Sequence, residues 1–168
     1  DAKWRSCYED KEKYPLFSAV QAAFAVDQEA YEGKGTIFFD CPPFEIGGKK
    51  VERISVKSYE YELGFAPAGK MVLQVNVPQF DKEYIYWKGL KKEEYENRKK
   101  EVVNAIEERL LMQFPRLQGC LEFLDCWTPI TYERYCNAYH GAYMGFITRK
   151  GVKSFRVKGI IKGVKNLY

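Results

Sequence analysis

A long amphipathic helix, predicted over Lys91–Phe114, constrains the fold of this chain more than any other feature. Apolar residues recur in it at intervals of three and four, at Val102, Val103, Ile106, Leu110 and Phe114. Pro115 ends the helix at Phe114. Surface ion pairs at i,i+4, such as Glu94 with Arg98, contribute only about 0.2 to 0.5 kcal/mol each. Most of the stability must therefore come from burial of the apolar stripe, which predicts a sheet face beneath the helix.

Segments with strand character precede and follow this helix. The predicted strands cover residues 16–26, 36–39, 51–63 and 71–77 before it, and 121–126, 155–157 and 160–164 after it. Leu16–Val26 is apolar on both faces, which is typical of a central strand. Cys41-Pro42-Pro43 is predicted to close the second strand, and Gly47-Gly48 to turn the chain into the third. This order predicts an α+β domain with a mixed, mostly antiparallel sheet, covered by one long helix and shorter helical pieces.

Length and composition favour a single domain. The chain has 168 residues, of which 46% are hydrophobic and 30% are charged. This composition provides both a core and a polar surface. No apolar run approaches the roughly 18 residues that would predict a membrane-spanning helix, and the first residues lack the apolar stretch of a signal peptide. Five cysteines, an odd number, argue for reduced thiols. We therefore expect a cytoplasmic location and no disulfide framework.

Positive charge is concentrated at the end of the chain. The net charge is +4, but no acid follows Glu133. Eight bases do follow it: Arg134, Arg149, Lys150, Lys153, Arg156, Lys158, Lys162 and Lys165. This basic tail, most of it in residues 146–168, has two interpretations: contact with an anionic membrane surface, at about 1 kcal/mol per base, or a face that is solvated or covered by another domain. The overall charge is modest and no nucleic-acid motif is present, so we expect no nucleic-acid partner.

Motifs for nucleotides, metals and nucleophilic catalysis are not found. Gly33-Lys34-Gly35 lacks the third glycine and the following helix of a dinucleotide-binding loop. The cysteines and the single histidine, His140, lack the paired spacing of zinc ligands. No nucleophile motif accompanies His140, so a surface or hydrogen-bonded loop histidine is expected. We predict no metal site and assign no catalytic residue.

The stretch Trp127–Tyr135 is more informative, because it combines aromatic residues, a rigid proline turn and the charged pair Glu133 and Arg134. Such a composition suits the wall of an apolar pocket with a few fixed polar groups. It also suits the aromatic edge of a core. Glu133 and Arg134 have a second interpretation as a structural ion pair at a domain boundary.

The run Thr128–Tyr135 (TPITYERY), followed by Gly141–Gly145 (GAYMG), resembles flavin-dependent oxidoreductases of the phytoene desaturase, carotenoid isomerase and retinol saturase type, which share the amine-oxidase fold. Three further stretches agree with this family. Residues 66–70 are similar to its AP-x-GK turn before a strand, a helix over Tyr84–Pro115 ends in a similar FP, and residues 164–168 are similar to the strand ahead of its C-terminal flavin motif.

The resemblance implies that this chain forms the substrate-binding domain of an FAD-dependent oxidoreductase that acts on a long apolar, carotenoid- or retinoid-like substrate. The substrate-binding residues that it implies are Thr128, Pro129, Tyr132, Arg134, Tyr135, Gly141, Tyr143 and Gly145. Pro129 and the two glycines would set backbone shape, and the other side chains would form the wall. The flavin would carry the redox chemistry.

The family's two flavin-binding segments, an N-terminal Rossmann glycine loop and a C-terminal glycine-rich segment, have no counterpart here. We therefore expect residues 1–168 to be a partial substrate-binding domain excised from a larger flavoenzyme, with residues 146–168 leading to the absent C-terminal flavin segment. On this hypothesis the chain binds no FAD and has no activity alone, and its partners are the apolar substrate and the flavin-binding domain of the same polypeptide. The alternative is a stand-alone binding module for an apolar ligand, without a redox role.

Overall fold

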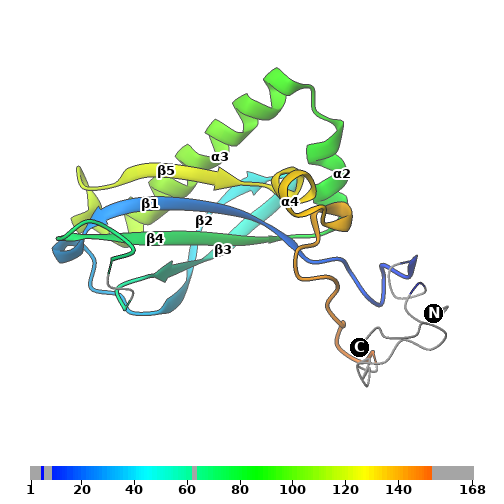
Figure 1. Cartoon of the computed structure of the whole chain (residues 1–168), viewed down its shortest axis with the longest axis horizontal. Coiled ribbons are helices and arrows are strands. Elements are labelled where there is room, and N and C mark those ends of the chain that lie inside the picture. The colour runs from blue at the N-terminus through cyan, green and yellow to red at the C-terminus, as the bar shows by residue number, and fades with distance from the viewer. Residues whose placement is uncertain (1–4, 6–8, 62–63, 153–168) are drawn as a thin grey trace.

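The structure is a computed structural model, and it describes residue 5 and residues 9–61 and 64–152. Its centre is a five-stranded sheet in the order β2-β3-β4-β1-β5 (Figure 1). The strands are β1 (Ser18–Asp27), β2 (Thr36–Ile46), β3 (Lys49–Ser58), β4 (Lys70–Gln79) and β5 (Glu122–Trp127). The helices are α2 (Asp81–Gly89), α3 (Lys92–Gln113) and α4 (Pro129–Cys136), with short 3-10 turns η1 (Gln28–Ala30), η2 (Pro115–Leu117) and η3 (Tyr139–Gly141). All strand pairings among the described residues are antiparallel, and the helices are separate from the strands in the chain, so the predicted α+β class is confirmed.

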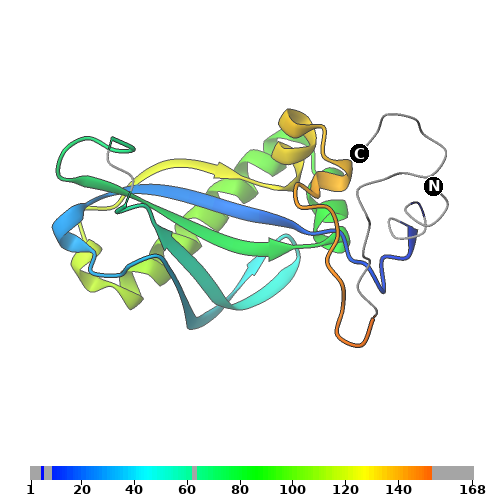
Figure 2. The same ribbon diagram turned by 60° about the horizontal axis from the view of Figure 1, so that its bottom comes forward.

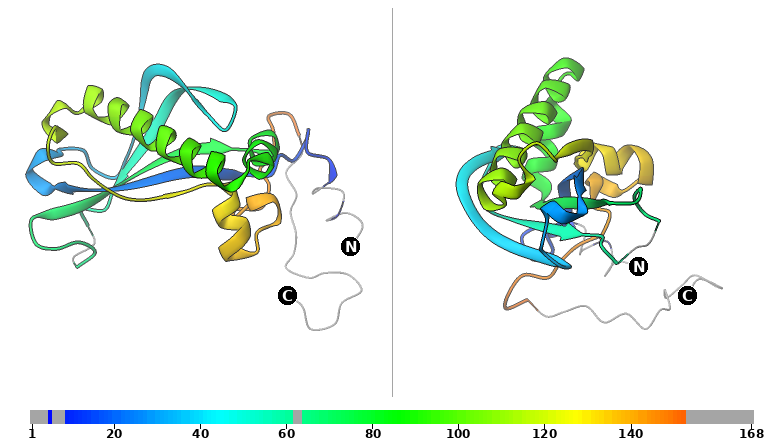
Figure 3. Two further views of the ribbon diagram at one scale, coloured as in Figure 1. Left: turned by 90° about the horizontal axis from the view of Figure 1, so that it is seen from above. Right: turned by 90° about the vertical axis from the view of Figure 1, so that its left-hand side faces the viewer.

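The core lies between α3 and one face of the sheet (Figure 3). Every second residue of β1, from Val20 to Val26, is buried on this side, and the same is true of β4 from Met71 to Val77. The predicted stripe of α3 packs on them, with Ile106 and Leu110 fully buried. The amphipathic pattern of the sequence thus identified both the helix and the sheet face that it covers.

The opposite face of the sheet is not crossed by α3. In Figure 2 the strands face the viewer, α3 lies behind them, and α2, α4 and the last described residues gather at one end. Residues of β4 on this side, such as Gln74 and Asn76, are half-buried, whereas their neighbours on the α3 side are buried. We call this surface the uncovered face.

The second strand is longer than predicted. Instead of ending before Cys41-Pro42-Pro43, β2 continues to Ile46, with a break in register between Asp40 and Phe44. Pro42 and Pro43 fall in this break, where β2 has no partner residues in β3, so neither proline costs a ladder hydrogen bond. The α3 residue Arg109 also donates to the carbonyl oxygens of Pro42 and Pro43, at 3.4 and 3.3 Å. These contacts fix the edge of the sheet against α3.

Two other boundaries differ from the predictions. The third strand ends at Ser58 rather than at residue 63, and the Ser58 hydroxyl there bonds the Gly35 carbonyl at 3.3 Å. The helix expected over Tyr84–Pro115 is two helices, because Leu90 is extended, with φ −75° and ψ 141°. A new helix, α3, follows the N-cap residue Lys91, whose amide donates to the Glu94 carboxylate at 3.0 Å.

The remaining strand predictions have different outcomes. Those for the first, fourth and fifth strands are confirmed within a few residues. Residues 155–157 and 160–164, and with them most of the basic tail, lie outside the described residues.

Cys41, Cys120, Cys126 and Cys136 are free thiols. Within the described ranges, no helix combines the length and the hydrophobicity needed to cross a bilayer.

Candidate ligand-binding site

The TPITYERY run forms α4, a helix that we expected only as a rigid turn. Thr128 is the extended N-cap residue, Pro129 occupies the first turn, and the Thr131 hydroxyl accepts the Thr128 amide at 3.1 Å. Asn137 ends the helix in the left-handed conformation, with φ 49°. A threonine before a proline, followed by an asparagine one helix length later, is the signal in the sequence that would have predicted α4.

The GAYMG run folds back onto the start of α4. Gly141 has φ 67°, and a Cβ atom placed on it would lie 2.2 Å from the Pro129 carbonyl oxygen. Only glycine permits this approach of the two backbones. At the end of the run, the Gly145 carbonyl accepts the Phe17 amide at 2.9 Å, just before β1. The two segments that carry the family resemblance are therefore one packed unit at the end of the sheet.

Tyrosine rings join this unit to the uncovered face. Tyr132 of α4 and Tyr143 of the loop stack with their ring centroids 4.4 Å apart, and Phe17 packs edge-on against Tyr143 at 6.2 Å. The Tyr132 hydroxyl donates to Oε1 of Gln21 on β1. Burial raises the pKa of both Tyr132 and Tyr143. The raised pKa of Tyr132 agrees with the donor role of its hydroxyl toward Gln21.

Three alanines and one glutamine of β1 lie on the side of the uncovered face. Ala19 and Ala23 are buried, whereas Gln21 and Ala25 are half-buried. Ala23 pairs with Gln74 of β4, whose Oε1 accepts the Tyr59 hydroxyl at 2.8 Å.

Tyr59 stacks on Phe65, with centroids 5.0 Å apart. Gln21 and Gln74 thus each accept a hydrogen bond from a tyrosine hydroxyl. Each of these tyrosines belongs to an aromatic cluster. The cluster at Gln21 consists of Phe17, Tyr132 and Tyr143, and the cluster at Gln74 consists of Tyr59, Tyr61 and Phe65.

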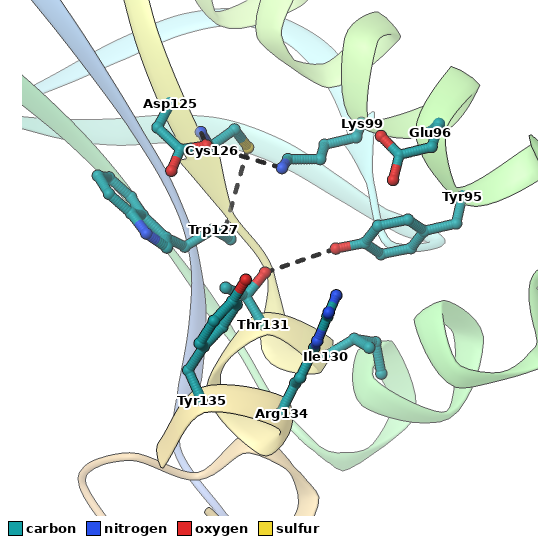
Figure 4. Close-up of a pocket in the computed structure, with 10 residues that line it drawn as sticks. All are labelled: Tyr95, Glu96, Lys99, Asp125, Cys126, Trp127, Ile130, Thr131, Arg134 and Tyr135. Carbon is teal, nitrogen blue, oxygen red and sulfur yellow. Dashed lines mark hydrogen bonds and ion pairs between the residues drawn. The ribbon is translucent and has the colours of Figure 1, made fainter. Parts of the chain in front are cut away.

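Arg134 and Tyr135 lie on another side of α4, in a groove of about 370 Å³ between α3, β5 and α4 (Figure 4). The groove is lined by Tyr95, Glu96, Lys99, Asp125, Cys126, Trp127, Ile130, Thr131, Arg134 and Tyr135. Arg134 lies over the Tyr135 ring at 5.3 Å, and Tyr135 is 75% exposed. These two predicted site residues therefore do not meet Tyr132 and Tyr143.

Glu133 pairs with α2 rather than with its neighbour Arg134. Its carboxylate accepts Lys88 Nζ at 2.7 Å and the Tyr84 hydroxyl at 2.9 Å. The interpretation of Glu133 and Arg134 as an ion pair is thus wrong. The hydrogen bond from Lys88, followed by that from Tyr84, lowers the pKa of Glu133. Burial, with the bond to Glu133, raises the pKa of Tyr84 to about 12.

The structure therefore divides the predicted site residues into three groups. Pro129, Tyr132, Gly141, Tyr143 and Gly145 belong to the packed unit beside the uncovered face. Arg134 and Tyr135 face the groove. Thr128 is fully buried, and its hydroxyl contacts the Tyr95 hydroxyl of α3 at 2.8 Å. Gln21, Gln74, Tyr59 and Tyr95 were not predicted, and the alternation along β1 and β4 is the only signal that could have pointed to the glutamines.

No three histidine, cysteine or acidic side chains of the described part lie together as a metal site would require. His140 contacts Lys11 and Asp81, as expected for a hydrogen-bonded loop histidine. Comparison of the chain with protein-family models, curated proteins and solved structures found no match.

Proposed function

We propose that this chain is the substrate-binding domain of an FAD-dependent oxidoreductase of the phytoene desaturase type, and that a long apolar, carotenoid- or retinoid-like substrate lies along the uncovered face of the sheet. The observation that carries the proposal is the packing of TPITYERY and GAYMG into one unit, which directs Tyr132 onto Gln21 of that face. Segments that resemble one family in sequence thus contribute to one surface.

The alanines of β1 on the uncovered face are small. Gln21, which accepts the Tyr132 hydroxyl, interrupts them, so Ala23 and Ala25 form the stretch without bulky side chains that we assign to the ligand. The amide oxygens of Gln21 and Gln74 accept tyrosine hydroxyls. Asn76, which pairs with Gln21 across the strands, has a buried Oδ1 without a partner among the described residues, so one polar group of the ligand could bind there. Aromatic rings stand at both clusters and offer large apolar contact areas. A polyene would offer an apolar surface to these aromatic rings.

The described residues do not themselves fit FAD. Flavin dinucleotides place their pyrophosphate at a free helix N-terminus. Here Glu83 and Glu94 accept the N-cap amides of α2 and α3, at 2.7 and 3.0 Å, and their negative charge opposes a phosphate. α4 begins with Pro129, which has no N–H. The proposal assigns the flavin to another domain of the same polypeptide.

The proposal is tested by titrating the chain with all-trans-retinol and following the quenching of tryptophan fluorescence. Ala23→Leu places a larger side chain among the alanines of β1. It is expected to weaken binding about tenfold or more, because one or two well-packed contacts with the ligand are lost. Asn104→Leu adds a similar side chain on exposed α3, and it should leave binding unchanged. Equal binding by both variants, or no binding by the unaltered chain, would overturn the assignment of this face.

The coding frame on either side of the segment separates the two functional classes. Glycine-rich flavin loops in the same frame support the oxidoreductase. Retinol binding without such loops would instead establish the alternative, a stand-alone module for an apolar ligand. The same proposal places the protein in the cytoplasm with its basic tail at a membrane surface, and absence of co-sedimentation with anionic vesicles at low salt would remove that part.

A further inference from the structure

The groove between α3, β5 and α4 is large enough for a small molecule. Its volume of about 370 Å³ lies in the range of ligand pockets, which is roughly 300 to 1,000 Å³. Charged side chains from all three elements line it: Lys99 from α3, Asp125 from β5 and Arg134 from α4 (Figure 4). Neither Gln21 nor Tyr132 lines the groove, so it is separate from the site proposed on the uncovered face.

Arg134 brings a guanidinium group without a counter-ion to this groove. The neighbouring Glu133 pairs with Lys88, and in the part of the chain that the structure describes no carboxylate forms an ion pair with Arg134. The guanidinium lies over the Tyr135 ring and points into the groove (Figure 4). A planar guanidinium that rests on a ring keeps its edge free, and that edge binds a carboxylate through two parallel hydrogen bonds.

Lys99 brings a second positive charge from α3. Its side chain is 23% exposed, and its Nζ lies 3.8 Å from Asp125 Oδ1, which is too far for a hydrogen bond. That oxygen already accepts the Cys126 amide at 2.7 Å. The N–H donors of Lys99 are therefore available to a ligand. Figure 4 shows Lys99 and Arg134 extending into the groove from two different helices.

Two carboxylates also line the groove, and neither cancels this attraction. The charge of Asp125 is compensated by Lys99. Glu96 is exposed, so water and salt screen its repulsion of an anion. In Figure 4 the Glu96 side chain stays beside α3, whereas Lys99 extends toward β5. The position of the charges, rather than their sum, therefore favours an anion.

The walls of the groove are apolar and aromatic. Ile130 and the rings of Tyr95 and Tyr135 line it, and Tyr135 is exposed. The Tyr95 ring is fixed in place, because its hydroxyl contacts the buried Thr128 hydroxyl at 2.8 Å. Such walls beside two cations match a ligand that has a flat apolar ring and one negative group.

We propose that this groove is a second binding site, which takes a small aromatic carboxylate. The carboxylate lies between Arg134 and Lys99, and the ring of the ligand packs on Tyr95 and Tyr135. The planar carboxylate matches the paired donors of the guanidinium. This proposal does not depend on the retinoid assigned to the uncovered face, because the two sites share no side chain that binds a ligand.

The test is calorimetric titration of the unaltered chain with 1-naphthoate at neutral pH. 1-Naphthalenemethanol has the same rings without the charge. Its dissociation constant should be about tenfold higher or more, because charge-assisted hydrogen bonds are the stronger ones. Equal affinity for the acid and the alcohol, or no binding of 1-naphthoate, would overturn the proposal.

Single substitutions separate the contributions of the charges. Arg134→Gln should raise the dissociation constant of 1-naphthoate about tenfold, because the charged donor pair is lost. Glu96→Gln removes an exposed repulsion and should lower it about twofold. Arg98→Gln is the matched control, since Arg98 is as exposed as Arg134 but pairs with Glu101 outside the groove. Equal affinities of Arg134→Gln and Arg98→Gln would contradict the assignment.

Amide chemical shifts locate the bound anion. Addition of 1-naphthoate should shift the signals of Cys126 and Thr131, which line the groove, and should leave that of Gln74 on the uncovered face unchanged. Shifts confined to Gln74 and its neighbours would place the anion on the uncovered face, and the groove would then not be its site.

Discussion

Gly141 lies directly against Pro129: a Cβ atom on the glycine would stand 2.2 Å from the proline carbonyl oxygen and 2.9 Å from its Cα. The contact joins the loop after α4 to the first turn of that helix. It depends on a positive φ of 67° as well as on the missing side chain. Two separate physical requirements therefore select glycine at position 141.

Substitution of Gly141 separates these requirements. Gly119 also has a positive φ, of 79°, but a Cβ there would meet no atom within 4 Å. Gly119→Ala should cost about 1 to 2 kcal/mol of unfolding free energy, from backbone strain alone. Gly141→Ala should cost roughly 1 to 3 kcal/mol more, from overpacking. Urea unfolding measures both, and equal losses would show that the loop does not pack on Pro129.

The hydrogen bond between Tyr95 and Thr128 couples α3 to α4. Their hydroxyl oxygens lie 2.8 Å apart, and Thr128 is fully buried. In a double-mutant cycle of Tyr95→Phe and Thr128→Val, we expect a coupling free energy of about 0.5 to 1.5 kcal/mol. Thr128→Ser keeps the hydroxyl and serves as the control. A coupling near zero would mean that the two residues are not bonded in solution.

Acid should weaken the domain through Glu133. Hydrogen bonds from Lys88 and Tyr84 lower the pKa of this carboxyl from its ordinary value of 4.5 in the folded state. A carboxylate with a lowered folded-state pKa contributes stability that is present above the unfolded pKa and lost as pH falls through the folded one. Glu133→Gln should therefore show a shallower loss of stability below about pH 4.5 than the unaltered chain.

Arg134→Gln is the matched control for that experiment. Arg134 is adjacent in sequence, but it faces the groove rather than Glu133. Its acid profile should follow that of the unaltered chain. Urea midpoints at several pH values measure all three proteins. A profile of Glu133→Gln identical to that of Arg134→Gln would remove Glu133 from the acid response.

The apolar stripe of α3 should account for most of the stability that the helix provides. Ile106 and Leu110 are fully buried, whereas Met112 on the same helix is 62% exposed. Truncation of either buried residue to alanine should cost about 2 to 5 kcal/mol. Met112→Ala should change the unfolding free energy by less than about 0.5 kcal/mol. Comparable losses at all three positions would contradict the packing of α3 on the sheet.

The purified chain should be colourless. Its described helix N-termini offer no free site for a dinucleotide, so added FAD should not be retained on gel filtration and no desaturase or saturase turnover should follow. The absorbance of the protein peak measures retention. Flavin absorbance that co-elutes with these 168 residues would contradict the assignment of the cofactor to another domain.

The sequence by itself determined the fold class, the long helix and most of the strands, but not the helix α4. The period of apolar residues in α3 and the alternation in β4 are local properties, and each fixes which side of an element is buried. From these periods the α+β class follows, because an amphipathic helix and a sheet with one apolar face must each bury that face against the other. Turn glycines such as Gly47 and Gly48 are equally local signals.

The tertiary structure alone decided which side chains meet. Gln21 and Tyr132 are 111 residues apart, and no periodicity links them. The axial rotation of α4 separates Tyr132 from Arg134 and Tyr135, and that rotation is set by Gly141 on Pro129 and by Thr128 on Tyr95. β2 passes through two prolines because they fall in a break of its pairing with β3 and Arg109 reaches their carbonyls. Such contacts join elements whose distance in three dimensions does not depend on their separation along the chain. A sequence pattern contains only the separation along the chain.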